Sequence, residues 1–238
     1  MAILKSCFDR TVQKEPEVEQ VGRLTPRAKG SNTKKLLDEF CRGFRRADNN
    51  TFEVFYLKSE QLINKHIAAF EAADHVILAF PLYTDAMPGI VKGFIEGLQQ
   101  SCRRKSNPTL GFIVQSGFPE AIHTQNVSRY LEKLSARLGC KCTGIVRRGG
   151  VEGIHYGSAK AGRKLFNTFY ELGRAYSSTG RMDAVICKKL ASPEVFPSWV
   201  AAILRIVRTL GLLDIMWNRE LKKNKAYDRR FSAPYCDS

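Results

Sequence analysis

The sequence has 238 residues, of which 26% are charged and 44% hydrophobic, as in ordinary soluble globular domains. Its net charge of +15 favours anionic partners, but no nucleic-acid-binding motif is present and we expect no nucleic-acid partner. No apolar run is long enough to span a membrane, no export signal is recognised, and the seven cysteines form no C-x-x-C pair. We therefore expect reduced thiols, no metal site and a cytoplasmic location.

From residue 32 to about 180, helical and strand-like segments alternate. Apolar residues recur at helical spacing in 36–44, 62–70, 90–98, 120–138 and 158–178. Short apolar runs occupy 51–57, 75–80, 110–115 and 142–146, and the second and third are nearly continuous, as in strands buried on both faces. The alternation predicts a parallel sheet with helices on both faces.

The position of the first strand has two interpretations. The segment EPEVEQVGRLT, residues 15–25, contains three glutamates and would form a weak strand. Alternatively, the apolar start of the chain, MAILKSCF, takes over part of this role across a long insertion.

The alternation stops after about residue 181, which predicts two parts: a domain at 1–180 and a helical extension at 181–238. The extension contains a helix whose apolar residues surround much of its circumference, with Arg205 and Arg208 on a narrower polar side. These apolar residues are Trp199, Val200, Ile203, Leu204, Ile206, Val207 and Leu210. Such a helix needs burial against the rim of its own domain, a second subunit or a membrane surface. We expect the extension to pack on the domain or, preferably, on a dimer partner, with peripheral contact to an anionic membrane as the alternative.

The first candidate ligand loop is TPRAKGSNTKKLLDEF, residues 25–40, in which a turn with Pro26 and Gly30 leads into a helix. Free backbone N–H groups and the helix dipole attract a phosphate to such a helix start. Polar or basic side chains surround it, namely Thr25, Arg27, Lys29, Ser31, Asn32 and Thr33. The loop lacks the G-K-[ST] ending of a Walker A motif. It is either a phosphate cradle or simply a capped helix after a polar turn.

Two further loops follow the most apolar strands, at 79–98 and 114–121. In a doubly wound sheet, ligands bind at the carboxyl ends of the strands. Tyr83 and Phe118 offer aromatic faces there and Gly117 permits close backbone approach, which suits a flat heteroaromatic ligand. Tyr83 could instead cover the edge of the core.

Over roughly residues 21–155 the sequence resembles the flavodoxin-like flavoproteins of the NADPH-dependent FMN reductase and NAD(P)H:quinone reductase group. TPRAKGSNT resembles their S-P-R-x-x-G-N-T phosphate loop, and FPLYTDAMPGIVKGFIE resembles their P-x-Y-x-x-x-x-P-x-x-x-K-x-x-I-D block beside the flavin. The resemblance implies a flavodoxin-like, doubly wound, five-stranded parallel sheet with helices on both faces. It also implies a homodimer with the flavin near the interface.

The same resemblance implies FMN as the cofactor and assigns its contacts. The phosphate contacts are Thr25, Arg27, Ser31, Asn32 and Thr33. The isoalloxazine contacts are Pro81, Leu82, Tyr83, Thr84, Gln115, Ser116, Gly117 and Phe118.

The expected function is that of an NAD(P)H-dependent oxidoreductase. NAD(P)H would reduce FMN by hydride transfer, and the flavin would reduce a quinone, a free flavin or another small acceptor. No catalytic side chain is expected, because the cofactor carries the chemistry. The polar segment before residue 25 favours one alternative, a flavin-less binding or regulatory module. A flavodoxin-type electron carrier is the other, but such carriers are typically acidic and this chain carries +15.

Overall fold

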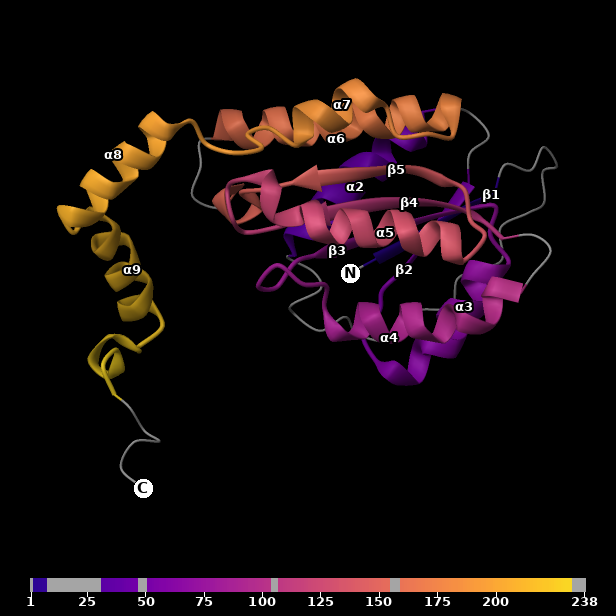
Figure 1. Ribbon diagram of the computed structural model, residues 1–238, viewed down its shortest axis with the longest axis horizontal. Helices are drawn as coiled ribbons and strands as arrows, with labels where there is room; N and C mark the ends of the chain where they lie inside the picture. The colour runs from indigo at the N-terminus through magenta and orange to yellow at the C-terminus, as the bar shows by residue number, and fades with distance from the viewer. Residues whose placement is uncertain (1, 8–30, 47–50, 104–106, 155–158, 233–238) are drawn as a thin grey trace. The chain divides into compact units, whose positions relative to one another are not determined.

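The computed structural model describes residues 2–7, 31–46, 51–103, 107–154 and 159–232. Five strands form one sheet in the order β2–β1–β3–β4–β5 (Figure 1). Their bounds are β1 Ala2–Cys7, β2 Thr51–Phe55, β3 His75–Pro81, β4 Thr109–Gln115 and β5 Cys142–Arg148. The order is the one expected of a flavodoxin-like sheet. Only β3, β4 and β5 pair in parallel with one another, because β1 runs antiparallel to both β2 and β3.

The predicted all-parallel sheet is therefore wrong at β1. This strand pairs Ala2 with Ala79 and Ser6 with His75, so it ends at the edge where β3 begins. Of the two interpretations of the first strand, it is the apolar chain start that joins the sheet, in second place between β2 and β3. The polar segment EPEVEQVGRLT lies outside the described residues.

Helices cover both faces of the sheet (Figure 1). One face carries α3 Ile63–Glu71, α4 Gly89–Gly97 and α5 Gln125–Arg137, and the other carries α2 Asn32–Phe44, α6 Ala159–Thr179 and α7 Ala184–Leu190. The five predicted helical segments are confirmed, except that 120–138 begins with a short 3-10 turn, η3 Ala121–Thr124. Helix α7 was not predicted as a separate element.

The two cores follow from the side-chain alternation along β3. Val76, Leu78 and Phe80 face α3, α4 and α5, whereas Ile77 and Ala79 face α2 and α6. All five side chains are at most 3% exposed. The sequence prediction that β3 is buried on both faces is thereby confirmed.

Helices α2 and α6 approach each other closely at two glycines. A β-carbon on Gly173 would overlap the backbone carbonyl of Phe40, and one on Gly43 would overlap the carbonyl of Tyr170. The missing side chains let the two backbones pack in direct contact, which fixes α2 on the sheet.

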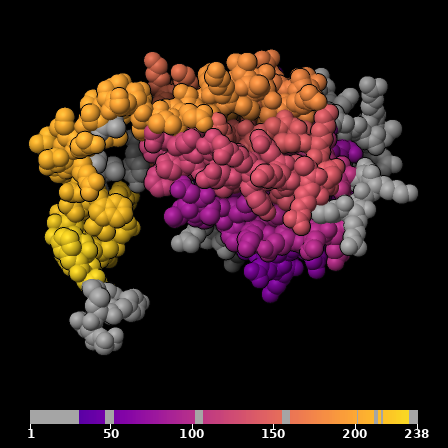
Figure 2. All heavy atoms as spheres, viewed as in Figure 1, coloured from indigo at the N-terminus to yellow at the C-terminus, as the bar shows by residue number. Residues whose placement is uncertain are grey.

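The chain divides into two compact units after Val195, and not at the predicted boundary after Gly180. Residues 181–195 belong to the first unit because they bond to β5: Met182 N–H donates to the carbonyl of Thr143 at 2.8 Å, and the Arg148 guanidinium donates to the carbonyls of Leu190 and Ser192. The second unit, yellow to orange in Figures 1 and 2, contains α8 Ser198–Thr209 and α9 Leu212–Lys223. Within the described ranges, no helix is both long and apolar enough to cross a bilayer.

Candidate functional site

A pocket of about 430 Å³ lies at the carboxyl ends of β3 and β4. This volume falls in the range of small-molecule sites, roughly 300–1,000 Å³. The lining residues are Pro81, Leu82, Tyr83, Thr84, Asp85, Gln115, Ser116, Gly117, Phe118 and Glu152. The structure thus brings together all eight residues predicted to contact an isoalloxazine ring, although their contact with flavin stays a prediction.

The first wall of the pocket is a tight turn after β3. Tyr83 and Ala86 exchange two backbone hydrogen bonds of 2.9 and 3.1 Å, and the residues between them, Thr84 and Asp85, have φ of 48° and 59°. These values describe a two-residue hairpin turn of the primed type. A β-branched threonine in this left-handed region is strained, and strain of this kind gathers at ligand sites. The turn leaves the Tyr83 ring 66% exposed at the pocket.

The second wall is the loop after β4, which backbone hydrogen bonds tie to its neighbours on both sides. Leu82 N–H donates to the Gln115 carbonyl at 2.7 Å, and Ser116 N–H donates to the Arg148 carbonyl at 2.9 Å. A β-carbon on Gly117 would lie 3.1 Å from Cγ of Glu152, so the glycine lets the Glu152 side chain approach the loop. These bonds make the pocket floor a fixed part of the sheet edge.

The third wall begins after β5 with the short turn η4 Val151–Ile154. Val151 N–H donates to the Ser116 carbonyl at 3.1 Å and Gly150 N–H donates to the Phe118 carbonyl at 2.6 Å. Sequence analysis placed no site residue in this segment and so missed Glu152. The available signal was the glycine-rich run RRGGVEG directly after the last strand.

The start of α2 meets these loops from the other side. Ser31 caps the helix by accepting a 3.2 Å hydrogen bond from Lys34 N–H, and the first turn holds no acidic residue. The side chains of Asn32 and Thr33 are 8% and 3% exposed. Asn32 Nδ2 donates to the Val151 carbonyl at 3.2 Å, and Gln115 Nε2 donates to Thr33 Oγ1 at 3.1 Å.

The side chains of Asn32 and Thr33 therefore join α2 to the loop after β5 and to the end of β4, and their contact with a phosphate stays a prediction. One acceptor is left over: Asn32 Oδ1 is buried and has no hydrogen-bond partner among the described residues. Thr25 and Arg27, the other two predicted phosphate contacts, lie outside those residues.

A histidine that sequence analysis left without a role joins two of the walls. His123 Nδ1 lies 3.2 Å from Asp85 Oδ1, and its ring stacks on Phe118 with the centroids 4.5 Å apart and the planes at 25°. The contact holds the Phe118 ring, which is 49% exposed, beside the pocket. Asp85 was also missed, because a turn aspartate is commonplace in sequence.

Among the residues that the structure describes, the lining of the strand-end pocket is acidic. It contains Asp85 and Glu152, whereas no lining residue is a lysine or arginine. The nearby cations are engaged elsewhere: Arg147 pairs with Glu194 at 2.7 Å, and Arg148 is bound to two carbonyls, with its pKa lowered by burial. A phosphate would therefore be attracted to the α2 start, through the N-terminal end of the helix dipole and Lys35, and not to the pocket floor; Lys34, in the same turn, pairs with Asp38.

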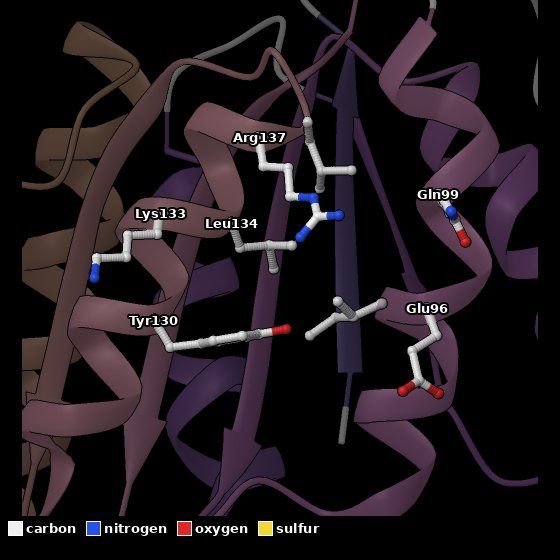
Figure 3. Close-up of a pocket in the computed structure, with 8 residues that line it drawn as sticks. Glu96, Gln99, Tyr130, Lys133, Leu134 and Arg137 are labelled. Carbon is white, nitrogen blue, oxygen red and sulfur yellow. The ribbon is translucent and has the colours of Figure 1, made fainter.

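A second pocket, of about 420 Å³, lies between α4 and α5 and includes none of the predicted site residues (Figure 3). Tyr130 and Arg137 point from α5 into the space between the helices, opposite Glu96 and Gln99 (Figure 3). It is away from the carboxyl ends of the strands, where this topology places ligands. No group of three or more His, Cys, Asp or Glu side chains that could hold a metal ion occurs in the described part of the chain.

Residues 24–101 match a family model described as the flavodoxin-like fold. The chain has a flavodoxin-like fold. The predicted resemblance is thereby confirmed at the level of the fold, and the matched residues contain the α2 start and the whole turn after β3. No curated protein matches the sequence.

Solved structures with a similar arrangement include three oxidoreductases. An NADPH-quinone reductase from P. pentosaceus has 16% identity and a TM-score of 0.46, with 61% of this chain and 91% of that chain covered. An NAD(P)H:quinone oxidoreductase from Methanothermobacter marburgensis has 16% identity and a TM-score of 0.43, with 61% and 89% covered. An NADH:FMN oxidoreductase in its apo form has 13% identity and a TM-score of 0.43, with 67% and 87% covered.

Proposed function

We propose that the flavodoxin-like pocket binds FMN and that the chain is an NAD(P)H-dependent oxidoreductase acting on a quinone, a free flavin or another small acceptor. The observation that carries the proposal is one pocket of about 430 Å³ that three strand-end loops line, with the α2 start hydrogen-bonded to Gln115 and Val151 in its walls. In a doubly wound sheet the ligand site lies at the carboxyl ends of the parallel strands, which is where this pocket lies. The family match to residues 24–101 supports the fold on which this depends.

The residues fit a flavin in three ways. The exposed rings of Tyr83 and Phe118 would hold the flat ring system by stacking. The unpartnered acceptor Asn32 Oδ1 suits a hydroxyl donor, such as those of the ribityl chain, better than it suits a phosphate. The first turn of α2, which has no acidic residue, suits the phosphate.

Bound FMN would supply hydride acceptance and electron transfer, which no protein side chain can supply. The chain's own part is to position the ring and to set the charge around it. Asp85 and Glu152 place two carboxylates on the pocket lining, which favours a neutral acceptor such as a quinone over one whose reacting group is itself acidic.

Two measurements test the proposal. After incubation with FMN and desalting, the protein should keep a flavin absorption band and should melt at a higher temperature than the untreated protein. Anaerobic stopped-flow mixing with NADH or NADPH should then bleach the flavin directly. A protein that stays colourless with no change in melting temperature would favour the flavin-less module. Flavin that is reduced only through a partner reductase would favour the electron carrier.

Paired tyrosine variants separate the proposed site from the second pocket. Tyr83→Ala should weaken FMN binding, because it removes a ring at the strand-end pocket. Tyr130→Ala is the matched control, since this tyrosine is also exposed but lines the pocket between α4 and α5. If Tyr130→Ala is the variant that lowers FMN affinity, the proposed location is wrong.

A further inference from the structure

The second compact unit exposes an unusual number of large apolar side chains. On α8 and its C-cap, Trp199, Ile206 and Leu210 are 64%, 59% and 67% exposed, and on α9 Trp217 is 64% exposed. Soluble proteins seldom leave apolar side chains gathered on one face in water without a binding role. We therefore expect these exposed apolar side chains to bind a partner.

Four exposed apolar side chains share one side of α8 and its C-cap. Trp199, Ile203, Ile206 and Leu210 follow one another at steps of four, three and four residues, which places them on a single stripe. We call these four residues the α8 stripe. Arg205 and Arg208 fall on the opposite side of the helix, and both are exposed. The helix is thus strongly amphipathic, with a cationic polar side.

The segment after α9 adds a second cluster of aromatic and cationic groups. The Lys222 amine lies 4.8 Å from the Tyr227 ring centroid, and the Arg230 guanidinium lies 3.9 Å from the same centroid and 4.7 Å from that of Phe231. Phe231 is 85% exposed. Aromatic rings beside lysine and arginine are the composition found where proteins meet lipid headgroups.

We propose that the second unit binds the surface of an anionic lipid bilayer, with the α8 stripe inserted among the upper acyl chains and the basic side chains at the headgroups. Helix α8 has 12 residues and is about 18 Å long, which is too short to cross a hydrocarbon core of about 30 Å. An amphipathic helix of this kind lies in the plane of the interface.

The net positive charge favours a bilayer over a second subunit, although the second subunit was the preferred expectation from the sequence. Each chain carries +15, so two copies repel each other, whereas an anionic bilayer attracts the arginines and lysines around the apolar side chains. A nucleic acid would satisfy the cations but would leave the α8 stripe in water. Dimer formation through this face becomes the competing outcome of the test.

The tryptophans provide a specific probe, because the chain has only two, Trp199 and Trp217, and both belong to the second unit. In the full-length protein without lipid, the indole emission should be that of water-exposed rings. Vesicles of phosphatidylcholine mixed with phosphatidylserine should shift the emission to the blue, and brominated acyl chains should quench it. Vesicles of phosphatidylcholine alone should have little effect, and added salt should weaken the binding. No flavin is needed, so the result is independent of the proposed function.

Variants at exposed positions complete the test, because substitutions there should leave the fold intact. Arg205→Glu with Arg208→Glu should weaken vesicle binding by about tenfold or more, and Trp199→Ser with Ile206→Ser should abolish the remaining insertion. Lys160→Glu with Lys164→Glu, the same charge change at exposed positions of α6 in the first unit, is the matched control and should keep most of the binding. Sedimentation equilibrium gives the competing result: a dimer that dissociates in the Trp199→Ser, Ile206→Ser variant, with no blue shift on anionic vesicles, would overturn the proposal.

Discussion

Gln115 at the end of β4 donates a hydrogen bond of 3.1 Å from Nε2 to Oγ1 of Thr33 in the first turn of α2, and both side chains are buried. The bond joins a pocket wall to the helix start that is proposed to hold a phosphate. The Thr33 hydroxyl accepts this bond and keeps its own hydrogen for another partner. Its position therefore links the two halves of the proposed FMN site.

The first prediction concerns this hydroxyl. Thr33→Ala should weaken FMN binding by about 1–3 kcal/mol, because a hydrogen bond to a charged group is lost and the Gln115 amide is left unpaired. Riboflavin, which lacks the phosphate, should lose much less affinity. Thr33→Ser should restore most of the FMN affinity, and titration calorimetry with both ligands measures the difference. Equal losses for FMN and riboflavin would show that Thr33 acts only through packing.

The second prediction concerns His123, which we consider a positioning residue for the pocket. His123→Ala removes both the stacking on Phe118 and the contact with Asp85, and should lower FMN affinity by about 0.5–1.5 kcal/mol. His123→Phe keeps the stacking alone and should recover part of the loss. Urea unfolding should change little in both variants, because the Asp85 contact is exposed. An unchanged FMN affinity in His123→Ala would remove the residue from the site.

The third prediction concerns the charge of Glu152. A carboxylate at the pocket opposes the negative charge that a flavin gains on reduction. Glu152→Gln should therefore raise the two-electron midpoint potential of bound FMN by about 10–30 mV, where 30 mV corresponds to about 1.4 kcal/mol. Potentiometric titration with reference dyes measures the shift. Glu96→Gln, on the second pocket, is the control and should leave the potential where it was.

The parts of the fold set by local periodicity could be predicted from sequence. The strands buried on both faces and the helical apolar spacing gave the layers and the location of the pocket loops, because a single sequence displays these patterns directly. The direction of β1 could not be predicted, since AILKSC has the same pattern in either direction and only its neighbours decide the pairing.

Side-chain roles were harder to predict than elements. A polar residue at a helix start is equally typical of a ligand contact and of an internal bond, and the structure gives Asn32 and Thr33 internal bonds. Glu152 and His123 come near the pocket through contacts with residues more than four positions away, which no local pattern displays. The inclusion of α7 in the first unit could not be predicted for the same reason, because it depends on bonds to β5, which is distant in the sequence.

The fourth prediction tests the close approach of α2 and α6. Gly173→Ala should destabilise the protein by about 1–3 kcal/mol, because the added methyl group meets the Phe40 carbonyl and forces the two backbones apart. Gly162→Ala in the same helix is the matched control, since a β-carbon there has no atom within 4 Å. This control should be neutral or stabilise by up to about 1 kcal/mol. Urea unfolding compares the two, and equal effects would contradict the close packing.

The fifth prediction concerns pH and His75, which lies at the start of β3. Its Nδ1 is 2.7 Å from Thr109 Oγ1 and 3.2 Å from the Tyr176 hydroxyl. Burial lowers the pKa of His75 below its ordinary value of 6.5, against a smaller opposing effect of Asp74. Burial also lowers the pKa of His66, with a further contribution from Lys65.

Because the unfolded histidines take up protons at a higher pH than the folded ones, the stabilisation is fully present above about pH 6.5 and is lost as pH falls from there through the folded pKa values. The free energy of unfolding should therefore be lower at about pH 5.5 than at about pH 7.5. His75→Gln keeps a hydrogen-bonding side chain but does not titrate, so it should remove the His75 share of this difference. Urea titrations of both proteins at the two pH values measure it. An identical difference in the variant would mean that His75 does not contribute, and a wild-type protein that gains stability on acidification would contradict the sign itself.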